Sequence, residues 1–222
     1  MRTSPEDIVV AAVNCGLDAI AITDHNSVDG IEPIIKAAMI NGLFVFPGIE
    51  LSARGGHTLA IFDEGTPIEK MRCLLDTLGF EGEQRGQGFA ETSFWIDEVF
   101  QRIVEFGGLA VAAHIDRKPK GFIASDENPR DKIRIHASDY LSALEVTIER
   151  DKALWNLGLM PHYPKRYACI QGSDAHGVGE VGRRFIYVDV PSLSLDGLRL
   201  AFSEYGRRIF FPSSVEASTE RE

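Results

Sequence analysis

The sequence is poor in cysteine and has no long hydrophobic run. Its three cysteines, Cys15, Cys73 and Cys169, lie far apart and form no C-x-x-C pair, which argues against a disulfide scaffold and suits a reducing compartment. No stretch approaches the roughly 18 apolar residues that a transmembrane helix needs. The opening residues, MRTSPEDIVV, carry no secretory signal. These absences predict a cytoplasmic protein without membrane contact.

Positive charge is also in short supply. The chain has 23 lysines and arginines against 33 acidic residues, a net charge of −10. This balance gives no general attraction to nucleic acid or anionic lipid. It is compatible with a carboxylate-rich site that binds cations, so we expect a small substrate and regard nucleic acid as a disfavoured partner.

What the sequence does contain is an alternation of short apolar runs and helical patterns. Nearly continuous apolar runs are typical of strands covered on both faces. The alternation predicts a mainly parallel α/β sheet, and six or seven strands favour a distorted (βα)7-type barrel. We expect one domain, residues 1–212, and a polar tail, residues 213–222. The predicted strands are LDAIAIT (17–23), LFVFPGI (43–49), HTLAIF (57–62), LAVAAH (109–114), SALEVT (142–147), YACIQG (167–172) and RFIYVDV (184–190).

Two features depart from a regular barrel. The runs 43–51 and 57–62 are joined by Ala53-Arg54-Gly55-Gly56, which predicts a hairpin. The chain also opens on a helix N-cap at Ser4, whereas a βα barrel opens on a strand, so the barrel is expected to lack its first strand. The run 17–23 would then be an open edge that invites self-association.

Imidazoles and carboxylates recur where the predicted strands end. In βα barrels these ends meet at one mouth, where active sites lie. Imidazole with carboxylate, and no thiolate, suits Zn²⁺, Mn²⁺ or Fe²⁺. Asp24 is expected to orient an imidazole rather than bind metal, and His136 and His162 are given no role. The predicted ligands are His25, Glu50, His57, His114, Asp174 and His176.

Basic residues near these ligands are candidates for binding a phosphate. Arg54 and Arg117 follow the ligands Glu50 and His114 closely, and Lys120 lies in the same loop as Arg117. A solvated basic loop would explain the same pattern, so the sequence leaves both interpretations open.

The segments AITDHN, GIEL, GGHTLAIF, AAHID and GSDAH together resemble the PHP family, the polymerase and histidinol phosphatase domain, over roughly residues 4–210. A weaker similarity, in GGLAVAAHID and the stretch from RFIYVDV to GRRI, is to PHP domains that precede an ATPase module. The resemblance implies a seven-stranded barrel with up to three divalent ions that hydrolyses phosphoesters by metal-activated water. His25 and His176 would share one ion, Glu50, His57 and His114 a second, and Glu50 and Asp174 a third, with the attacking hydroxide held between Glu50 and Asp174.

The first motif of that family, a strand with His-x-His, is absent from this sequence. Only the ion on Glu50, His57 and His114 would keep three protein ligands, so about one tightly bound ion and impaired hydrolysis are expected. One alternative is a non-catalytic metal-binding or regulatory remnant of a larger PHP–ATPase protein. Another is a nuclease that acts on nucleic-acid ends.

Overall fold

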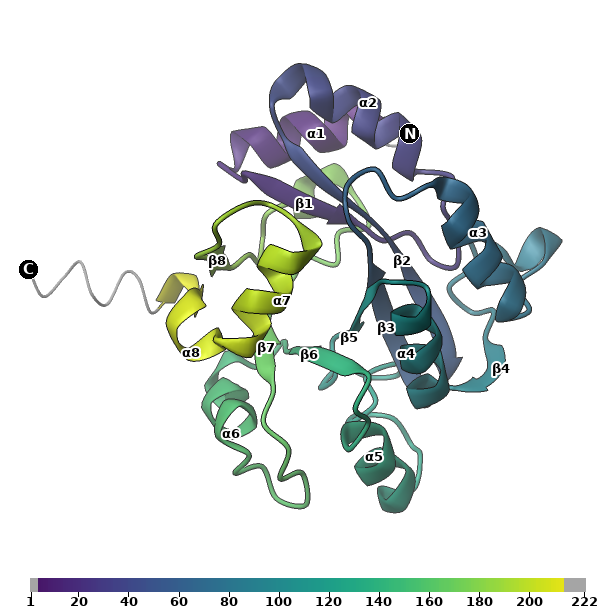
Figure 1. Ribbon diagram of the computed structural model, residues 1–222, viewed down its shortest axis with the longest axis vertical. Coiled ribbons are helices and arrows are strands. Elements are labelled where there is room, and N and C mark those ends of the chain that lie inside the picture. Colours follow the sequence, from purple (N-terminus) through teal and green to yellow (C-terminus); the bar gives the residue numbers. More distant parts are fainter. Residues whose placement is uncertain (1–3, 214–222) are drawn as a thin grey trace, which may run out of the picture.

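The computed structural model of the protein describes residues 4–213. Within that range, seven strands form one curled sheet in the order β1-β2-β3-β5-β6-β7, with β4 also paired to β2 (Figure 1). The pairs β1–β2, β2–β4, β5–β6 and β6–β7 are parallel, and β3 runs antiparallel to both β2 and β5. The strands are β1 (Ala19–Ile22), β2 (Phe44–Arg54), β3 (Gly56–Ile61), β4 (Thr92–Trp95), β5 (Leu109–Ala112), β6 (Leu141–Glu145) and β7 (Ala168–Ile170).

The sheet is a half-barrel whose two ends, β1 and β7, do not pair with each other within residues 4–213. The expected α/β barrel is therefore confirmed in its incomplete form, with β1 as an edge strand. The predicted hairpin is also confirmed, because β2 and β3 turn at Gly55 and Gly56. A Cβ on Gly56 would lie 2.8 Å from the carbonyl oxygen of Lys120, so the close approach of this loop explains the glycine.

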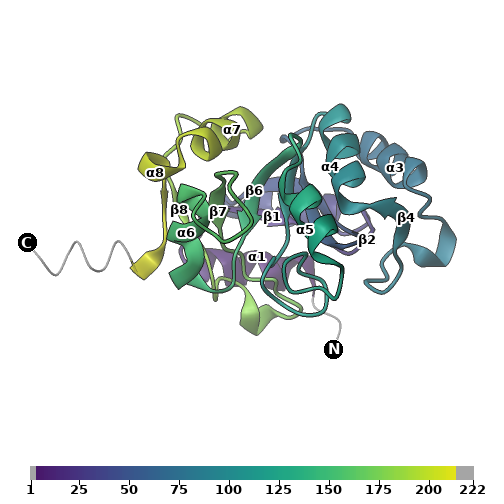
Figure 2. The ribbon, with the colours of Figure 1, turned by 90° about the horizontal axis from the view of Figure 1, so that it is seen from below.

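Helices cover the outside of the sheet, as the two perpendicular views show (Figures 1 and 2). Helix α1 follows the expected signals: Ser4 and Asp7 form a reciprocal capping box, and Pro5 occupies the first turn. None of the described helices is long and apolar enough to cross a membrane. The helices are α1 (Pro5–Asn14), α2 (Ile31–Asn41), α3 (Ile68–Thr77), α4 (Ile96–Glu105), α5 (Pro129–His136), α6 (Lys152–Leu157), α7 (Leu195–Ser203) and α8 (Tyr205–Arg208).

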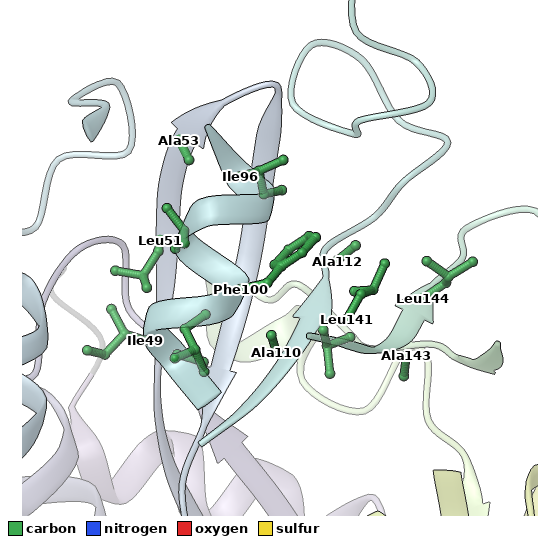
Figure 3. Packing of buried hydrophobic residues seen from close by; sticks show 14 of the residues in the cluster. Ile49, Leu51, Ala53, Ile96, Phe100, Ala110, Ala112, Leu141, Ala143 and Leu144 are labelled. Carbon is green, nitrogen blue, oxygen red and sulfur yellow. The ribbon is translucent and has the colours of Figure 1, made fainter. Parts of the chain in front are cut away.

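The main core lies between α4 and the strands β2, β5 and β6 (Figure 3). Phe100 of α4 is fully buried, as are Ile49 and Leu51 of β2. Burying side chains of this size stabilises the fold by about 1.5–3 kcal/mol each. The core thus fixes the hairpin and β5 against each other, and these strands bear Glu50 and His57 and lead into His114.

Three sequence predictions need correction or fall outside the described residues. The run 184–190 does not join the main sheet, because only β8 (Tyr187–Val188) forms, and it pairs antiparallel with β9 (Ile209–Phe210). Residues 92–95, which lie outside every predicted strand, form strand β4, whose pairing with β2 covers the end of the hairpin. The predicted polar tail, 213–222, lies outside the described residues except for Ser213.

Candidate metal centre

The carboxylate of Glu50 is the hub of the candidate site. It sits near the middle of β2 and is only 5% exposed. Its Oε1 lies 2.9 Å from His57 Nδ1 and 3.1 Å from His114 Nε2, and its Oε2 lies 3.3 Å from His25 Nδ1. Three imidazoles from three separate segments therefore converge on one buried carboxylate.

The contact between His25 and Glu50 is short but lacks hydrogen-bond geometry. His25 Nδ1 is buried and has no hydrogen-bond partner, although it is 3.3 Å from the carboxylate. One ligand atom from each of His25, Glu50 and His57 lies within 4.8 Å of the others. Nitrogen lone pairs and carboxylate oxygens that face a common point suit a divalent ion such as Zn²⁺. The residues present therefore fit the metal that the sequence predicts.

Asp174 and His176 lie at the rim of the same site. The His25 and His176 ring centroids are 5.9 Å apart. His176 Nδ1 is 3.9 Å from Asp174 Oδ1, but the His176 side chain is 65% exposed. The other Asp174 oxygen pairs with Arg117. These two predicted ligands are thus near the cluster but outside its buried part.

Backbone strain is concentrated at this mouth. Among the described non-glycine residues, four have positive φ, and three of them border the site: Asn26 (φ 48°), His114 (φ 29°) and Asp174 (φ 47°). Each such conformation costs of the order of 1–3 kcal/mol and persists only where the surroundings enforce it. His114 and Asp174 adopt this conformation shortly after β5 and β7 have ended, and both residues line the cavity at the mouth.

Glu145 is a site residue that the sequence reasoning missed. It ends β6, is 5% exposed, and accepts the backbone N–H of His114 at 2.8 Å. A Cβ on Gly172 would lie 2.5 Å from Glu145 Oε1, so a larger residue at position 172 would require the Glu145 side chain to shift. Burial raises the pKa of Glu145. Glu145 lies inside the predicted strand 142–147, and the sequence does not single it out, because its contact with His114 joins residues that are 31 positions apart in the chain.

A second missed group anchors a loop over the hub. Asn26 Nδ2 donates to the carbonyl oxygens of Gln87 and Ala90, both at 2.9 Å, and its Oδ1 accepts the Ser52 N–H at 3.0 Å. Ser52 Oγ in turn lies 3.1 Å from His57 Nε2. These bonds fix His57 through its other ring nitrogen and hold the loop 87–90 beside His25.

The electrostatics of the cluster favour an ionised carboxylate. Burial raises the pKa of Glu50, but hydrogen bonds from His114 and His57 outweigh burial and hold the pKa well below its usual range. Burial lowers the pKa of His57. Burial alone would also lower the pKa of His114, yet its hydrogen bond to Glu50 and the charge of that carboxylate raise it. An anionic hub among imidazoles is the charge state that binds a cation.

A cavity of about 150 Å³ lies directly over the histidines. Arg117 and Lys120 line it together with Asp174, and Lys120 pairs with Glu91. Arg54 does not line this cavity: its guanidinium stacks on Trp95 at 3.9 Å and faces Glu127 at 3.7 Å. Two of the three predicted phosphate-binding side chains are thus placed at the mouth, and the third is held on a neighbouring surface.

The remaining two histidines take no part in the cluster, and a glycine-rich stretch adjoins its rim directly after His176, whose backbone N–H donates to Glu180 at 2.7 Å. His136 is buried among Trp155, Tyr163 and Tyr167, and burial lowers its pKa to about 4. His162 has a positive φ of 72° in its loop. Residues 177–182 have the spacing G-x-G-x-x-G, but they form a 3-10 turn at Val178–Glu180 that leads into no α-helix. A dinucleotide fingerprint needs that helix, so this stretch is not one.

Comparison with known proteins agrees with this geometry. The family model "PHP domain" matches residues 2–151. An error-prone DNA polymerase from Cutibacterium acnes is 42% identical over 98 residues, which cover 38% of this chain and 9% of the polymerase. This chain is therefore a small fraction of that relative's length.

Two solved structures share the fold. One is the lesion-specific endonuclease PfuEndoQ from Pyrococcus furiosus (18% identity, TM-score 0.67, covering 93% of this chain and 52% of that one). The other is a predicted metal-dependent phosphoesterase from Bifidobacterium adolescentis (17% identity, TM-score 0.58, 96% and 89%). At these identities they show the fold alone. The family match covers well over half of the chain, and the chain therefore belongs to the PHP domain family.

Proposed function

We propose that the protein is a metal-dependent hydrolase of phosphoesters. The observation that carries the proposal is the convergence of His25, His57 and His114 on the buried carboxylate of Glu50, beside a cavity lined by Arg117 and Lys120. The membership of the PHP family and the similarity to a predicted metal-dependent phosphoesterase support it.

The metal would be held by Glu50 with His25, His57 and His114. A divalent ion in such a site lowers the pKa of bound water toward about 7 and neutralises phosphate charge. His57 and His114 each turn one ring nitrogen toward Glu50 and could bind the ion through it. Ser52 contacts the other ring nitrogen of His57, and Glu145 accepts the backbone N–H of His114. Outer groups of this kind set ligand direction and basicity.

Asp174 and His176 would hold a second ion, more weakly than the buried cluster holds the first. Asp174 is shared with Arg117, and His176 is largely exposed. We therefore propose about one tightly bound ion per chain, on the buried cluster, because three or four protein ligands complete its coordination. Glu50 and Asp174 would flank the attacking water.

The substrate phosphate would be bound by the cations of the rim. Arg117 can form a paired contact with phosphate oxygens, and Lys120 lies across the same cavity. Both side chains are paired with acids, Asp174 and Glu91, so the phosphate would exchange places with these carboxylates. Arg54 remains a more distant candidate.

A direct test uses p-nitrophenyl phosphate with Zn²⁺ or Mn²⁺ added to metal-stripped protein. We expect slow hydrolysis that chelator abolishes and that His114→Ala lacks. Wild type and His114→Ala with equal rates in every metal would contradict the hydrolase and favour the alternative, a metal-binding domain without turnover.

A nuclease is the second candidate, favoured by the similarity to a lesion-specific endonuclease. Arg117 and Lys120 would bind a backbone phosphate as readily as a small ester. Assaying a 5′-labelled oligonucleotide beside p-nitrophenyl phosphate separates the two. Cleavage of the oligonucleotide that is faster than hydrolysis of the small ester, and is lost in His114→Ala, would replace the small-substrate proposal.

A further inference from the structure

The turn that carries His114 lies just beyond the end of β5. Residue 114 comes two positions after Ala112, the last residue of that strand, and its φ of 29° is in the left-handed region. Residues other than glycine adopt this region at a cost and keep it only where neighbouring groups enforce it. A specific contact should therefore hold this turn.

His57 and His114 both face Glu50, but their second ring nitrogens differ. His57 Nε2 lies 3.1 Å from Ser52 Oγ, so a side chain contacts this ring from behind. His114 Nδ1 is buried, and no group among the described residues forms a hydrogen bond with it. Apart from the contact with Glu50, the direction of the His114 ring therefore depends on its packing and its backbone.

Glu145, the last residue of β6, holds this backbone at two points. Its Oε2 accepts the His114 N–H at 2.8 Å, and its main-chain carbonyl oxygen accepts the Ile115 N–H at 2.9 Å. Glu145 is 5% exposed, and a hydrogen bond to a buried carboxylate is stronger than one between neutral groups. The carboxylate thus contacts the left-handed turn directly, at the residue that would bind the ion.

Gly172 leaves the space in which this carboxylate lies. A Cβ on Gly172 would lie 2.5 Å from Glu145 Oε1 and 3.7 Å from its Cδ. Because the close contact is with the end of a flexible side chain, a methyl group at position 172 would move the carboxylate rather than the backbone. The segment that leads to Asp174 and His176 therefore also limits where the Glu145 carboxylate can lie.

Asp116 joins the same two segments in the reverse direction. Its carboxylate accepts the N–H and the hydroxyl of Thr147 at 2.9 and 2.7 Å, and the N–H of Ile148 at 2.7 Å. These bonds end on residues that are not predicted ligands. A comparison of Asp116 with Glu145 therefore separates a residue that only joins two loops from one that holds the backbone of a ligand.

We propose that Glu145 is a positioning residue for His114. Its carboxylate, seated against Gly172, fixes the left-handed turn and so directs the His114 ring toward Glu50, where the ion would bind. The consequence for metal affinity rests on the proposed function, whereas the positioning itself is a property of the metal-free chain. Removal of an outer group of this kind typically lowers metal affinity roughly 10–100-fold.

The first experiment measures the Zn²⁺ affinity of the 222-residue chain by competition with a chromophoric chelator. Glu145→Ala removes the acceptor and should weaken binding about tenfold or more. Glu145→Gln keeps an oxygen acceptor and should bind within about threefold of wild type. Asp116→Ala, the structural control, should lower the urea midpoint but keep Zn²⁺ affinity within about threefold of wild type. Equal affinity in wild type and Glu145→Ala, or an equal loss in Asp116→Ala, would overturn the proposal.

Gly172→Ala tests the same contact from the other side. It should weaken Zn²⁺ binding about tenfold by displacing the carboxylate. In a Glu145→Ala background the same methyl group should have no further effect, because no carboxylate is left to displace. Gly179→Ala is the matched control, since a Cβ there meets no atom within 4 Å. Additive losses from Gly172→Ala and Glu145→Ala would show that the two residues act independently and would contradict the proposal.

A metal-free measurement separates this inference from the metal centre itself. Hydrogen exchange at the His114 amide, followed by NMR in the presence of chelator, should be about tenfold or more faster in Glu145→Ala than in wild type or Glu145→Gln. Equal protection in wild type and Glu145→Ala would overturn the positioning role. A wild-type chain that shows the expected difference but binds no Zn²⁺ would support the positioning of His114 and contradict the metal-dependent hydrolase.

Discussion

Two short apolar strands of this protein, β1 (AIAI) and β5 (LAVA), have nearly the same composition, and each leads to a histidine of the cluster. Strand β5 lies between β3 and β6 and every residue in it is buried. Strand β1 pairs only with β2 among the described strands, and its residues are half-buried or exposed. The His114 side chain is 5% exposed and that of His25 27%. An apolar run thus predicts a strand, but the burial of the histidine that follows it depends on how many strands pair with that strand.

The largest expected effect separates the two histidines. His114→Ala should lower kcat/KM by several kcal/mol of transition-state stabilisation, because it removes a buried metal ligand. His25→Ala should cost less, since water can replace the more exposed imidazole. Steady-state kinetics with p-nitrophenyl phosphate and a zinc titration of each variant measure the difference. Equal losses would mean that burial does not rank these ligands.

Stability should separate the two strands in the same order. Leu109→Ala in β5 removes a side chain that is 2% exposed and should lower the free energy of unfolding by about 3 kcal/mol. Ile22→Ala in β1 removes a half-buried side chain and should cost about 1 kcal/mol, because less apolar area leaves water on folding. Urea denaturation of both variants, without metal, compares them. A larger loss of unfolding free energy in Ile22→Ala than in Leu109→Ala would show that packing at the edge strand β1 contributes more to stability than its exposure suggests.

His136 lies outside both strands, and its burial should make the free energy of unfolding depend on pH. Burial lowers the pKa of His136 to about 4, against about 6.5 in the unfolded chain. The unfolded state therefore binds the proton first, and stability is lost as pH falls from about 6.5 toward 4, by up to roughly 2–3 kcal/mol. His136→Phe should remove this part of the pH dependence. Urea midpoints of wild type and variant between pH 4 and 7 measure it, and parallel curves would mean that His136 titrates alike in both states.

The sequence predicted most of the sheet because β2, β3, β5, β6 and β7 are largely buried and read as nearly continuous apolar runs. The hairpin was readable from Gly55 and Gly56. Strand β4 was not, since TSFW runs directly into a helix and pairs only at the tip of β2. The predicted strand 184–190 was too long. Its apolar residues do pack against the core, but most of its backbone forms a loop. The carbonyl oxygens of Arg184 and Phe185 accept hydrogen bonds from the Ser173 and Gln171 side chains instead of from a neighbouring strand.

The sequence likewise predicted part of the candidate site and missed the rest. Strand ends pointed to His25, Glu50 and His114, and the structure brings these three together, though their role as ligands stays a prediction. Asn26 and Glu145 could not be assigned from the sequence, because their importance lies in bonds to the distant segments 87–90 and 114. Arg54 was placed near the mouth by its distance along the chain from Glu50, but its stacking on Trp95 turns it to another surface.

The central claim, that Glu50 is the hub of a metal centre, is tested most directly by elemental analysis of the purified 222-residue protein beside Glu50→Gln, both dialysed after loading with Zn²⁺. Glutamine keeps the size of the side chain but removes the charge that gathers the three imidazoles. The account predicts about one tightly held ion per wild-type chain and little in Glu50→Gln. Equal metal in the two proteins, or none in the wild type, would contradict it.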